Sequence, residues 1–211
     1  MTRATLLIVM LAACGGGAQS AASSGSASSG SASTASEAAA PSEAGARAAK
    51  AELAAASLTS APARVVARAR LNASIEEVWD YVSNHDNLVE YTNGILQSAD
   101  IDRSGAGGSD GVGVRRECAA GQDRFVEEIV YFRAPYAFAY SAVENTWGLT
   151  NHLATVVLTP DGDGTILEWS QHFDHMQPEA LPMMTENLTG MMNGPILGFF
   201  TQRFGGEVLA S

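Results

Sequence analysis

The chain has 211 residues, a formal net charge of −11 at pH 7 and 46% hydrophobic residues. From residue 62 onward, nine arginines and no lysine stand against twenty aspartates and glutamates. A field of that sign repels phosphate backbones and anionic lipid headgroups, so composition argues against nucleic acid as a partner.

The amino terminus has the layout of a secretion signal. Arg3 precedes an apolar run that is too short to span a bilayer, and residues 1–13 fit a signal peptide. The sequence LAAC at 11–14 resembles a bacterial lipobox. This resemblance implies cleavage before Cys14 and lipidation of its sulfur, which would anchor the protein to a membrane outside the cytoplasm, at the periplasmic face or the outer membrane. The alternative is an ordinary secretory signal with an unrelated cysteine.

Residues 14–61 are dominated by Ala, Ser and Gly and contain almost no large apolar side chains. Such a segment cannot offset the conformational entropy lost on ordering. We therefore expect a disordered linker that follows the lipidated Cys14, with transient helix near 44–57. The folded domain is expected to comprise residues 62–211.

The predicted domain opens with a strand and a helix. Residues 64–72 alternate apolar and polar side chains, which indicates a strand with one solvated face. Ser74 and Glu77 have the spacing of a capping box, and apolar residues recur behind them at helical spacing. Residues 85–94 predict a short second helix or turn.

A series of strand-like segments follows without intervening helices. The predicted strands are 95–103, 112–118, 124–132, 137–144, 152–160 and 165–173. Short turns between successive strands favour an antiparallel sheet. Within it, Cys118 is the only cysteine left once Cys14 carries lipid, so no internal disulfide is available, and we expect Cys118 to be a small packed side chain.

The carboxyl-terminal segment returns to helical spacing. Its apolar side is formed by Met184, Leu188, Met191 and Met192. Pro195 is expected to kink or break the helix. Methionine is flexible and polarisable, and it suits surfaces that accept varied apolar ligands.

Three stretches carry a resemblance to a known family: LNASIEEVWDYVSNHDNLVEYTNGI, RFVEEIVYFRAPYAFAYSAVE and HLATVVLTPDGDGTILEWSQHF. Together with the terminal helix they resemble the START-like (SRPBCC) superfamily, in its polyketide cyclase/dehydrase and lipid-transport branch. The resemblance implies an α+β helix-grip fold, with a curved antiparallel sheet of about seven strands around a long C-terminal helix. It also implies a cavity that takes hydrophobic molecules such as lipids, sterols, quinones or polyketides.

Candidate site residues follow from this implied cavity and from strand periodicity. Residues two apart on a strand share a face, so position 169 shares a face with 171 and 173. The residues expected to line the cavity are Trp169, Gln171, Phe173, Tyr140, Trp147, Met184, Leu188, Met191 and Met192.

Titratable residues leave several alternatives open. Glu127 and Glu128 are adjacent on a strand, so one of them faces the cavity, and the sequence does not decide which. His152 could form an acid–base pair with Asp174 or Glu127, or it could simply be hydrogen-bonded. We expect no metal site and no cofactor.

The sequence thus predicts a membrane-anchored monomer that binds or transports a hydrophobic small molecule such as a lipid or quinone. A cavity on the order of several hundred Å³ is expected for that role. The first alternative is a cyclase or hydratase type of enzyme that uses a cavity carboxylate or histidine. The second is a cell-envelope interaction module without a cavity. The superfamily has no shared catalytic signature, so the resemblance does not decide between carrier and enzyme.

Overall fold

The structure is a computed structural model that describes residues 40–210. The predicted signal peptide, Cys14 and the first part of the predicted linker lie outside the described residues. Residues 40–210 belong to one compact unit.

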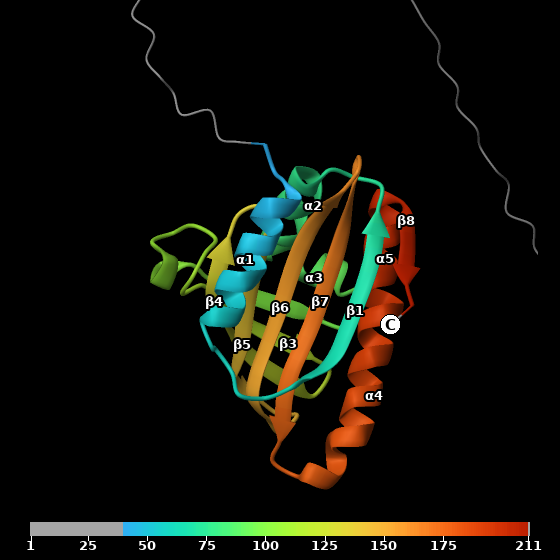
Figure 1. The fold of residues 1–211 in the computed structure, drawn as a ribbon. Coiled ribbons are helices and arrows are strands. Elements are labelled where there is room, and N and C mark those ends of the chain that lie inside the picture. Colours follow the sequence, from blue (N-terminus) through green and yellow to red (C-terminus); the bar gives the residue numbers. More distant parts are fainter. Residues whose placement is uncertain (1–39, 211) are drawn as a thin grey trace, which may run out of the picture. The chain divides into compact units, whose positions relative to one another are not determined.

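One antiparallel sheet organises this unit, and Figure 1 shows it with helices on both faces. Its spatial order is β2-β3-β4-β5-β6-β7-β1-β8. The strands are β1 (Ala63–Leu71), β2 (Ser98–Asp102), β3 (Arg115–Ala120), β4 (Asp123–Arg133), β5 (Ala137–Asn145), β6 (Leu149–Asp161), β7 (Gly164–His175) and β8 (Gly206–Leu209).

The sheet confirms the predicted antiparallel arrangement and adds an eighth strand to the expected seven. β8 follows a reversal at Gly205 and Gly206, both of which have positive φ angles. A Cβ atom at Gly206 would lie 2.0 Å from the carbonyl oxygen of Arg70, so the close approach of β8 to β1 requires glycine there.

The opening strand and helix form as predicted. β1 buries Val65, Ala67, Ala69 and Leu71, the apolar half of its alternation. Helix α2 (Ile75–Val82) begins at Ser74, whose side chain accepts the Glu77 N–H while the Glu77 carboxylate accepts the Ser74 N–H. The short η1 (His85–Asn87) and α3 (Leu88–Tyr91) follow. These elements bring the chain to the inner face of the sheet.

The C-terminal helix is long but not uniform. It comprises η3 (Pro178–Ala180), α4 (Leu181–Met191), the π-helical segment η4 (Met192–Ile196) and α5 (Leu197–Phe204). Pro195 lies within the π-helical segment. Proline cannot donate the usual backbone hydrogen bond and collides with the preceding turn of a regular α-helix. The wider π turn accommodates it, so the predicted irregularity occurs without ending the helix.

The prediction of a disordered linker through residue 61 is wrong for residues 43–55. These residues form α1 (Glu43–Ala55), which packs on the outer face of the sheet (Figure 1). Ala46, Ala49 and Leu53 are buried in that contact. The small alanine side chains let the helix lie close to the sheet, so a stripe with one large apolar residue suffices.

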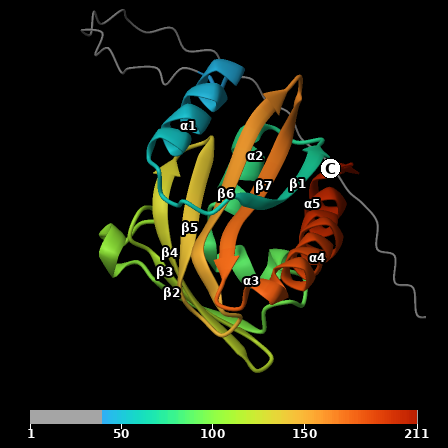
Figure 2. The same ribbon diagram turned by 60° about the horizontal axis from the view of Figure 1, so that its bottom comes forward.

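Two apolar layers result, one on each face of the sheet. The outer layer lies beneath α1 and includes Ala137, Ala139, Leu153 and Val157. The larger inner layer joins the sheet to α2, α3 and the C-terminal helix. Figure 2 shows these helices and the sheet from below. The candidate site lies within the inner layer.

Candidate functional site

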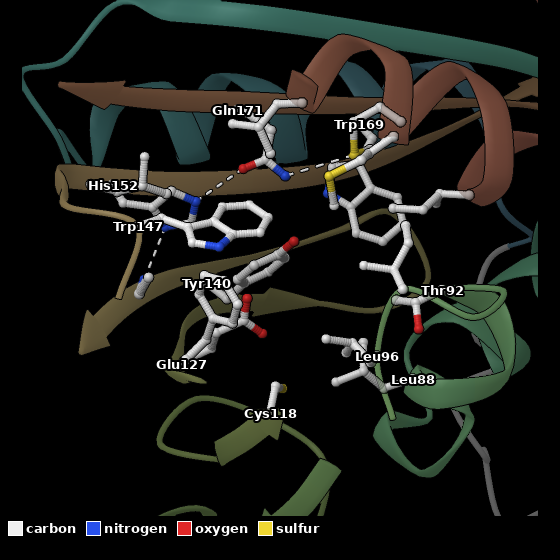
Figure 3. Close-up of a pocket in the computed structure, with 18 of the residues that line it drawn as sticks. Leu88, Thr92, Leu96, Cys118, Glu127, Tyr140, Trp147, His152, Trp169 and Gln171 are labelled. Carbon is white, nitrogen blue, oxygen red and sulfur yellow. Dashed lines mark hydrogen bonds between the residues drawn. The ribbon is translucent and has the colours of Figure 1, made fainter. Parts of the chain in front are cut away.

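A cavity of about 100 Å³ lies between the inner face of the sheet, α3 and the C-terminal helix. It is not completely enclosed, and Figure 3 shows most of its lining side chains. The lining residues are predominantly apolar: Leu88, Tyr91, Thr92, Ile95, Leu96, Cys118, Phe125, Glu127, Tyr140, Ala142, Trp147, Leu149, His152, Trp169, Gln171, Leu188, Met191, Met192 and Ile196.

Seven of the nine residues predicted from the sequence line this cavity. They are Trp169, Gln171, Tyr140, Trp147, Leu188, Met191 and Met192. Phe173 is fully buried on the expected face, but it lies outside the cavity lining, with the Arg64 guanidinium 5.7 Å from its ring centroid. Met184 is half-buried and packs against the core instead. Periodicity identified the correct face in both cases, but not the position of the cavity along it.

Aromatic side chains shape the cavity wall. Trp147 meets Phe125 edge to face, with ring centroids 4.6 Å apart. Its backbone carbonyl lies 2.8 Å from His175 Nε2. His175 Nδ1 lies 2.9 Å from both the backbone N and O of Gln177, so the ring links the Trp147 turn to the segment after β7. Trp169 adds a second edge-to-face contact, with Tyr140.

A short hydrogen-bonded chain crosses the cavity wall (Figure 3). His152 Nδ1 accepts the backbone N–H of Ala142 at 2.9 Å, so Nε2 carries the proton and donates to Gln171 Oε1 at 3.0 Å. Gln171 Nε2 then points to the sulfur of Met192 at 3.9 Å. Burial lowers the pKa of His152 and keeps the ring neutral.

The structure does not form the acid–base pair considered for His152. Both of its ring nitrogens are engaged, and neither Asp174 nor Glu127 hydrogen-bonds to it. Asp174 instead pairs with Arg64 at 3.0 Å and accepts a hydrogen bond from Asn151. His152 therefore orients Gln171 and has no free nitrogen with which to move a proton.

The charged residue of the cavity wall is Glu127. Its carboxylate Oε2 lies 2.7 Å from Nη2 of Arg116, a side chain that is 1% exposed. The Arg116 guanidinium also lies over the ring of Tyr140, 4.2 Å from the ring centroid. Burial would lower the pKa of Arg116, but the nearby Glu127 carboxylate raises it above its usual value, so the guanidinium stays charged.

This pair settles the choice between the two adjacent glutamates. Glu127 lines the cavity, whereas Glu128 pairs with the exposed Arg115 at 2.8 Å on the other face. A register shift between Val126 and Glu127 lies next to this position in the pairing of β4 with β5. The alternation of side chains along a strand required Glu127 and Glu128 to point to opposite faces of the sheet. It did not indicate which of the two faces the cavity.

Cys118 also reaches the cavity. It is free and buried, as expected for a packed side chain. Burial, followed by the influence of Glu127, raises the pKa of its thiol to about 12. A thiol held protonated is a poor nucleophile. Cys118 therefore contributes volume and an apolar surface to the wall.

Several lining residues were missed by sequence reasoning. They come from the turn after α3 and from the strand ends: Thr92, Ile95, Leu96, Phe125 and Leu149. Nothing in their spacing marks a cavity, because their positions depend on how the segment after α3 folds under the sheet. The glycine-rich loop at 104–113 contributes no lining residue.

A second hollow, of about 380 Å³, lies on the outer face between α1, the segment after it and strands β6 and β7. Its wall includes the ion pair of Lys50 with Glu168 at 2.6 Å and the hydroxyl-bearing Thr155 and Ser170. It lacks aromatic side chains apart from His172. The inner cavity is therefore the better candidate for an apolar ligand.

Two further properties concern residues 40–210 alone. Within this range, His, Cys, Asp and Glu side chains do not gather in groups of three or more that could hold a metal ion. None of the helices in the same range has both the length and the apolar character needed to cross a membrane.

Comparison with solved structures supports the fold. A solution NMR structure from Thermobifida fusca is 19% identical with a TM-score of 0.56, over 67% of this chain and 92% of that one. The protein XoxI from Bacillus cereus is 18% identical with a TM-score of 0.54, over 66% and 94% of the two chains. Truncated norcoclaurine synthase from Thalictrum flavum is 16% identical with a TM-score of 0.54, over 66% and 91%. At these identities the likeness concerns the fold alone.

Comparison at the level of sequence gives the family. No curated protein matches the chain. A family model described as "Polyketide cyclase / dehydrase and lipid transport" matches residues 62–198, which span nearly all of the sheet, α2, α3 and the first part of the C-terminal helix. On this match, the chain belongs to the polyketide cyclase/dehydrase and lipid-transport family.

Proposed function

We propose that the chain binds a hydrophobic small molecule in the cavity between the sheet and the C-terminal helix. The observation that carries this proposal is the cavity wall, in which aromatic, leucine and methionine side chains surround a few polar groups. Such a lining is typical of sites for apolar ligands. The family description, which includes lipid transport, agrees with it.

The size of the cavity limits what enters without movement. Its volume of about 100 Å³ is smaller than expected from the sequence and below the range of roughly 300–1,000 Å³ for drug-sized ligands. A dry cavity of about 150 Å³ is enough for benzene. The cavity as it stands is smaller than that, so it suits only the end of a chain or part of a ring, and a larger ligand requires the wall to move.

The C-terminal helix is the part of the cavity wall best suited to move. Met191 and Met192 have flexible side chains and lie where α4 meets the π-helical segment. Gly190, Gly194 and Gly198 lie on the outward side of the helix, where an added Cβ would meet no side chain and no backbone of another element within 4 Å. This side of the helix has free space, and a small displacement of the helix would enlarge the cavity.

The proposal extends to location. The lipobox resemblance supports lipidation of Cys14, and the domain would then be held at a membrane outside the cytoplasm, where apolar ligands are concentrated. Two or three acyl chains anchor a protein far more firmly than the marginal hold of one, since each buried CH₂ contributes about 0.8 kcal/mol.

Occupancy of the cavity tests the proposal. The full chain, purified gently, is denatured and the released molecules are identified by mass spectrometry. We expect an apolar compound in near-stoichiometric amount. Cys118→Leu, which fills the cavity, should lose most of it, while Cys118→Ala should retain it. Circular dichroism checks that both variants fold.

Two results would contradict the proposal. One is a wild-type chain that releases no apolar compound and takes up none of a panel of fatty acid, sterol and quinone analogues. The other is equal occupancy of the wild type and a folded Cys118→Leu variant, which would put the ligand elsewhere.

A further inference from the structure

The charged group that the cavity presents is a carboxylate. Glu127 is a lining residue whose side chain is 17% exposed, and Figure 3 shows it beside Tyr140 on the sheet side of the pocket. Arg116 is not a lining residue, and the Tyr140 ring stacks on its guanidinium. A ligand in the cavity therefore meets the negative member of the ion pair and not the positive one.

This carboxylate has unused capacity to accept hydrogen bonds. Arg116 lies against Oε2 of Glu127, but in the described part of the chain none of its guanidinium N–H groups forms a hydrogen bond of good geometry, so Oε1 receives none from it. An ionised carboxylate offers about four lone-pair sites. The unused acceptor is thus at Glu127.

The neighbouring polar groups do not fill this capacity. The His152 Nε2 proton is directed to Gln171, and the Gln171 amide is directed to Met192. Both donors are committed within the wall, where Gln171 and Trp169 also lie close to the Tyr140 hydroxyl. A ligand that brings its own hydrogen-bond donor could donate to the free acceptor sites of the Glu127 carboxylate.

An anionic ligand headgroup would be repelled by the Glu127 carboxylate. It would bring a second negative charge next to Glu127 in a largely apolar cavity, where like charges strongly disfavour each other. The compensating charge of Arg116 is already paired and covered. Fatty acids, whose headgroup is a carboxylate, would therefore bind poorly.

We infer that Glu127 makes the cavity selective for ligands whose apolar body ends in a neutral hydrogen-bond donor, such as a hydroxyl group, and against ligands that end in a carboxylate. This inference rests on the proposed binding function. It narrows the ligand class from apolar molecules in general to apolar alcohols and phenols.

A matched ligand series tests it on the wild-type chain. The probes are 4-hexylphenol, 4-hexylanisole and 4-hexylbenzoate, which share a ring and a chain and differ in the headgroup. At about pH 7 the phenol is a neutral donor, the anisole has no donor and the benzoate is charged. Binding is followed by the fluorescence of Trp147 and Trp169, which line the cavity, and by calorimetry.

We expect the phenol to bind at least tenfold more tightly than the benzoate and more tightly than the anisole. Equal affinities, or tighter binding of the benzoate, would overturn the selectivity while leaving the binding function in place. Failure of all three probes to bind would count against the binding function itself and the selectivity with it.

Variants assign the effect to one side chain. Glu127→Gln should bring the phenol-to-benzoate affinity ratio close to one, whereas Glu128→Gln, a neighbouring glutamate paired with Arg115 on the outer face, should keep the wild-type ratio. Since Glu127→Gln leaves Arg116 without its partner, the double variant Arg116→Met/Glu127→Gln serves where the single variant does not fold. A folded variant lacking Glu127 that retains the wild-type ratio would refute the assignment.

Discussion

His85 has no exposed surface, and neither of its ring nitrogens has a hydrogen-bond partner in the described part of the chain. The ring packs edge to face against Phe138, with centroids 5.9 Å apart. Burial, followed by the positive charges of Arg116 and Arg103, lowers the pKa of His85 to about 3. Between these two pKa values, about 3 and 6.5, the native protein therefore keeps this imidazole neutral, whereas an unfolded chain would protonate it.

This difference predicts a loss of stability in mild acid. An unfolded histidine takes up a proton near pH 6.5, but the folded His85 does not until about pH 3, so stability is complete above the first value and falls between the two. The slope is on the order of 1 kcal/mol per pH unit. Between about pH 7 and pH 5, wild-type protein should lose about 1–2 kcal/mol more free energy of unfolding than His85→Phe, which keeps a buried ring without a titrating group.

Urea denaturation at the two pH values measures this difference. The window lies above the range in which carboxylates titrate, so the acidic residues contribute little. The buried His152 acts in the same direction in both proteins and cancels in the comparison. Parallel losses in wild type and His85→Phe would show that His85 is protonated at little cost in the native state.

At the scale of elements, α1 lies wholly outside the region matched by the family model, on its amino-terminal side. Contacts from distant strands hold it: Tyr131 donates its hydroxyl to the Ala49 carbonyl at 3.2 Å, and Lys50 pairs with Glu168. Arg133 forms a further ion pair with Glu52. Gly45 lies directly over Tyr136, where a Cβ would come within 2.2 Å of the hydroxyl oxygen.

Gly45→Ala therefore has opposite effects in two backgrounds. In an isolated helix, alanine is favoured over glycine by about 1 kcal/mol. In this protein the added methyl group collides with Tyr136, so we expect the free energy of unfolding to fall by about 1 kcal/mol or more. In a Tyr136→Ala background the collision is absent, and the same substitution should stabilise by up to about 1 kcal/mol.

The double-mutant cycle is read from urea denaturation curves of the four proteins. A change of sign between backgrounds supports a helix docked over Tyr136. Stabilisation by Gly45→Ala in both backgrounds would mean that α1 does not pack on the sheet in solution.

For the molecule as a whole, sequence patterns predicted the elements that form through interactions between neighbouring residues. The alternation of β1 and the capping box of α2 depend on neighbouring residues, and both form as expected. For α1 the sequence predicted only a transient helix near 44–57, because the buried stripe of this helix consists mostly of alanine and its partners lie far away in the chain. β8 was missed because it forms by pairing with β1, which lies more than a hundred residues earlier in the chain.

The same division applies to the candidate site. Periodicity placed Trp169 and Gln171 on the inner face, and both line the cavity. It could not tell that Phe173, on the same face, lies beyond the cavity, because the position along the strand is set by the elements that cover it. The direction of Glu127 required the register of β4, and the commitment of His152 to Gln171 required two strands to be in place.

The last whole-molecule prediction tests the proposed anchoring of the chain to a membrane through Cys14. With a net charge of −11, the chain is repelled by anionic headgroups, so electrostatic docking is a poor means of retention. Retention should then depend on Cys14. We expect the wild type to stay with the membrane fraction through a high-salt wash and to leave it in detergent, whereas Cys14→Ala should be found in the soluble fraction with its signal uncleaved or cleaved elsewhere.

Intact-mass spectrometry of the detergent-extracted protein completes this test. A mature chain that begins at Cys14 and carries the additional mass of acyl groups is the expected result, because several acyl chains give the firm anchoring that a salt wash does not disturb. Cys118→Ala is the matched control, since it removes the other cysteine and should not change the fractionation. Wild-type protein that leaves the membrane in high salt, or a Cys14→Ala variant that stays there, would mean that the chain is held by another contact and that the lipobox resemblance is coincidental.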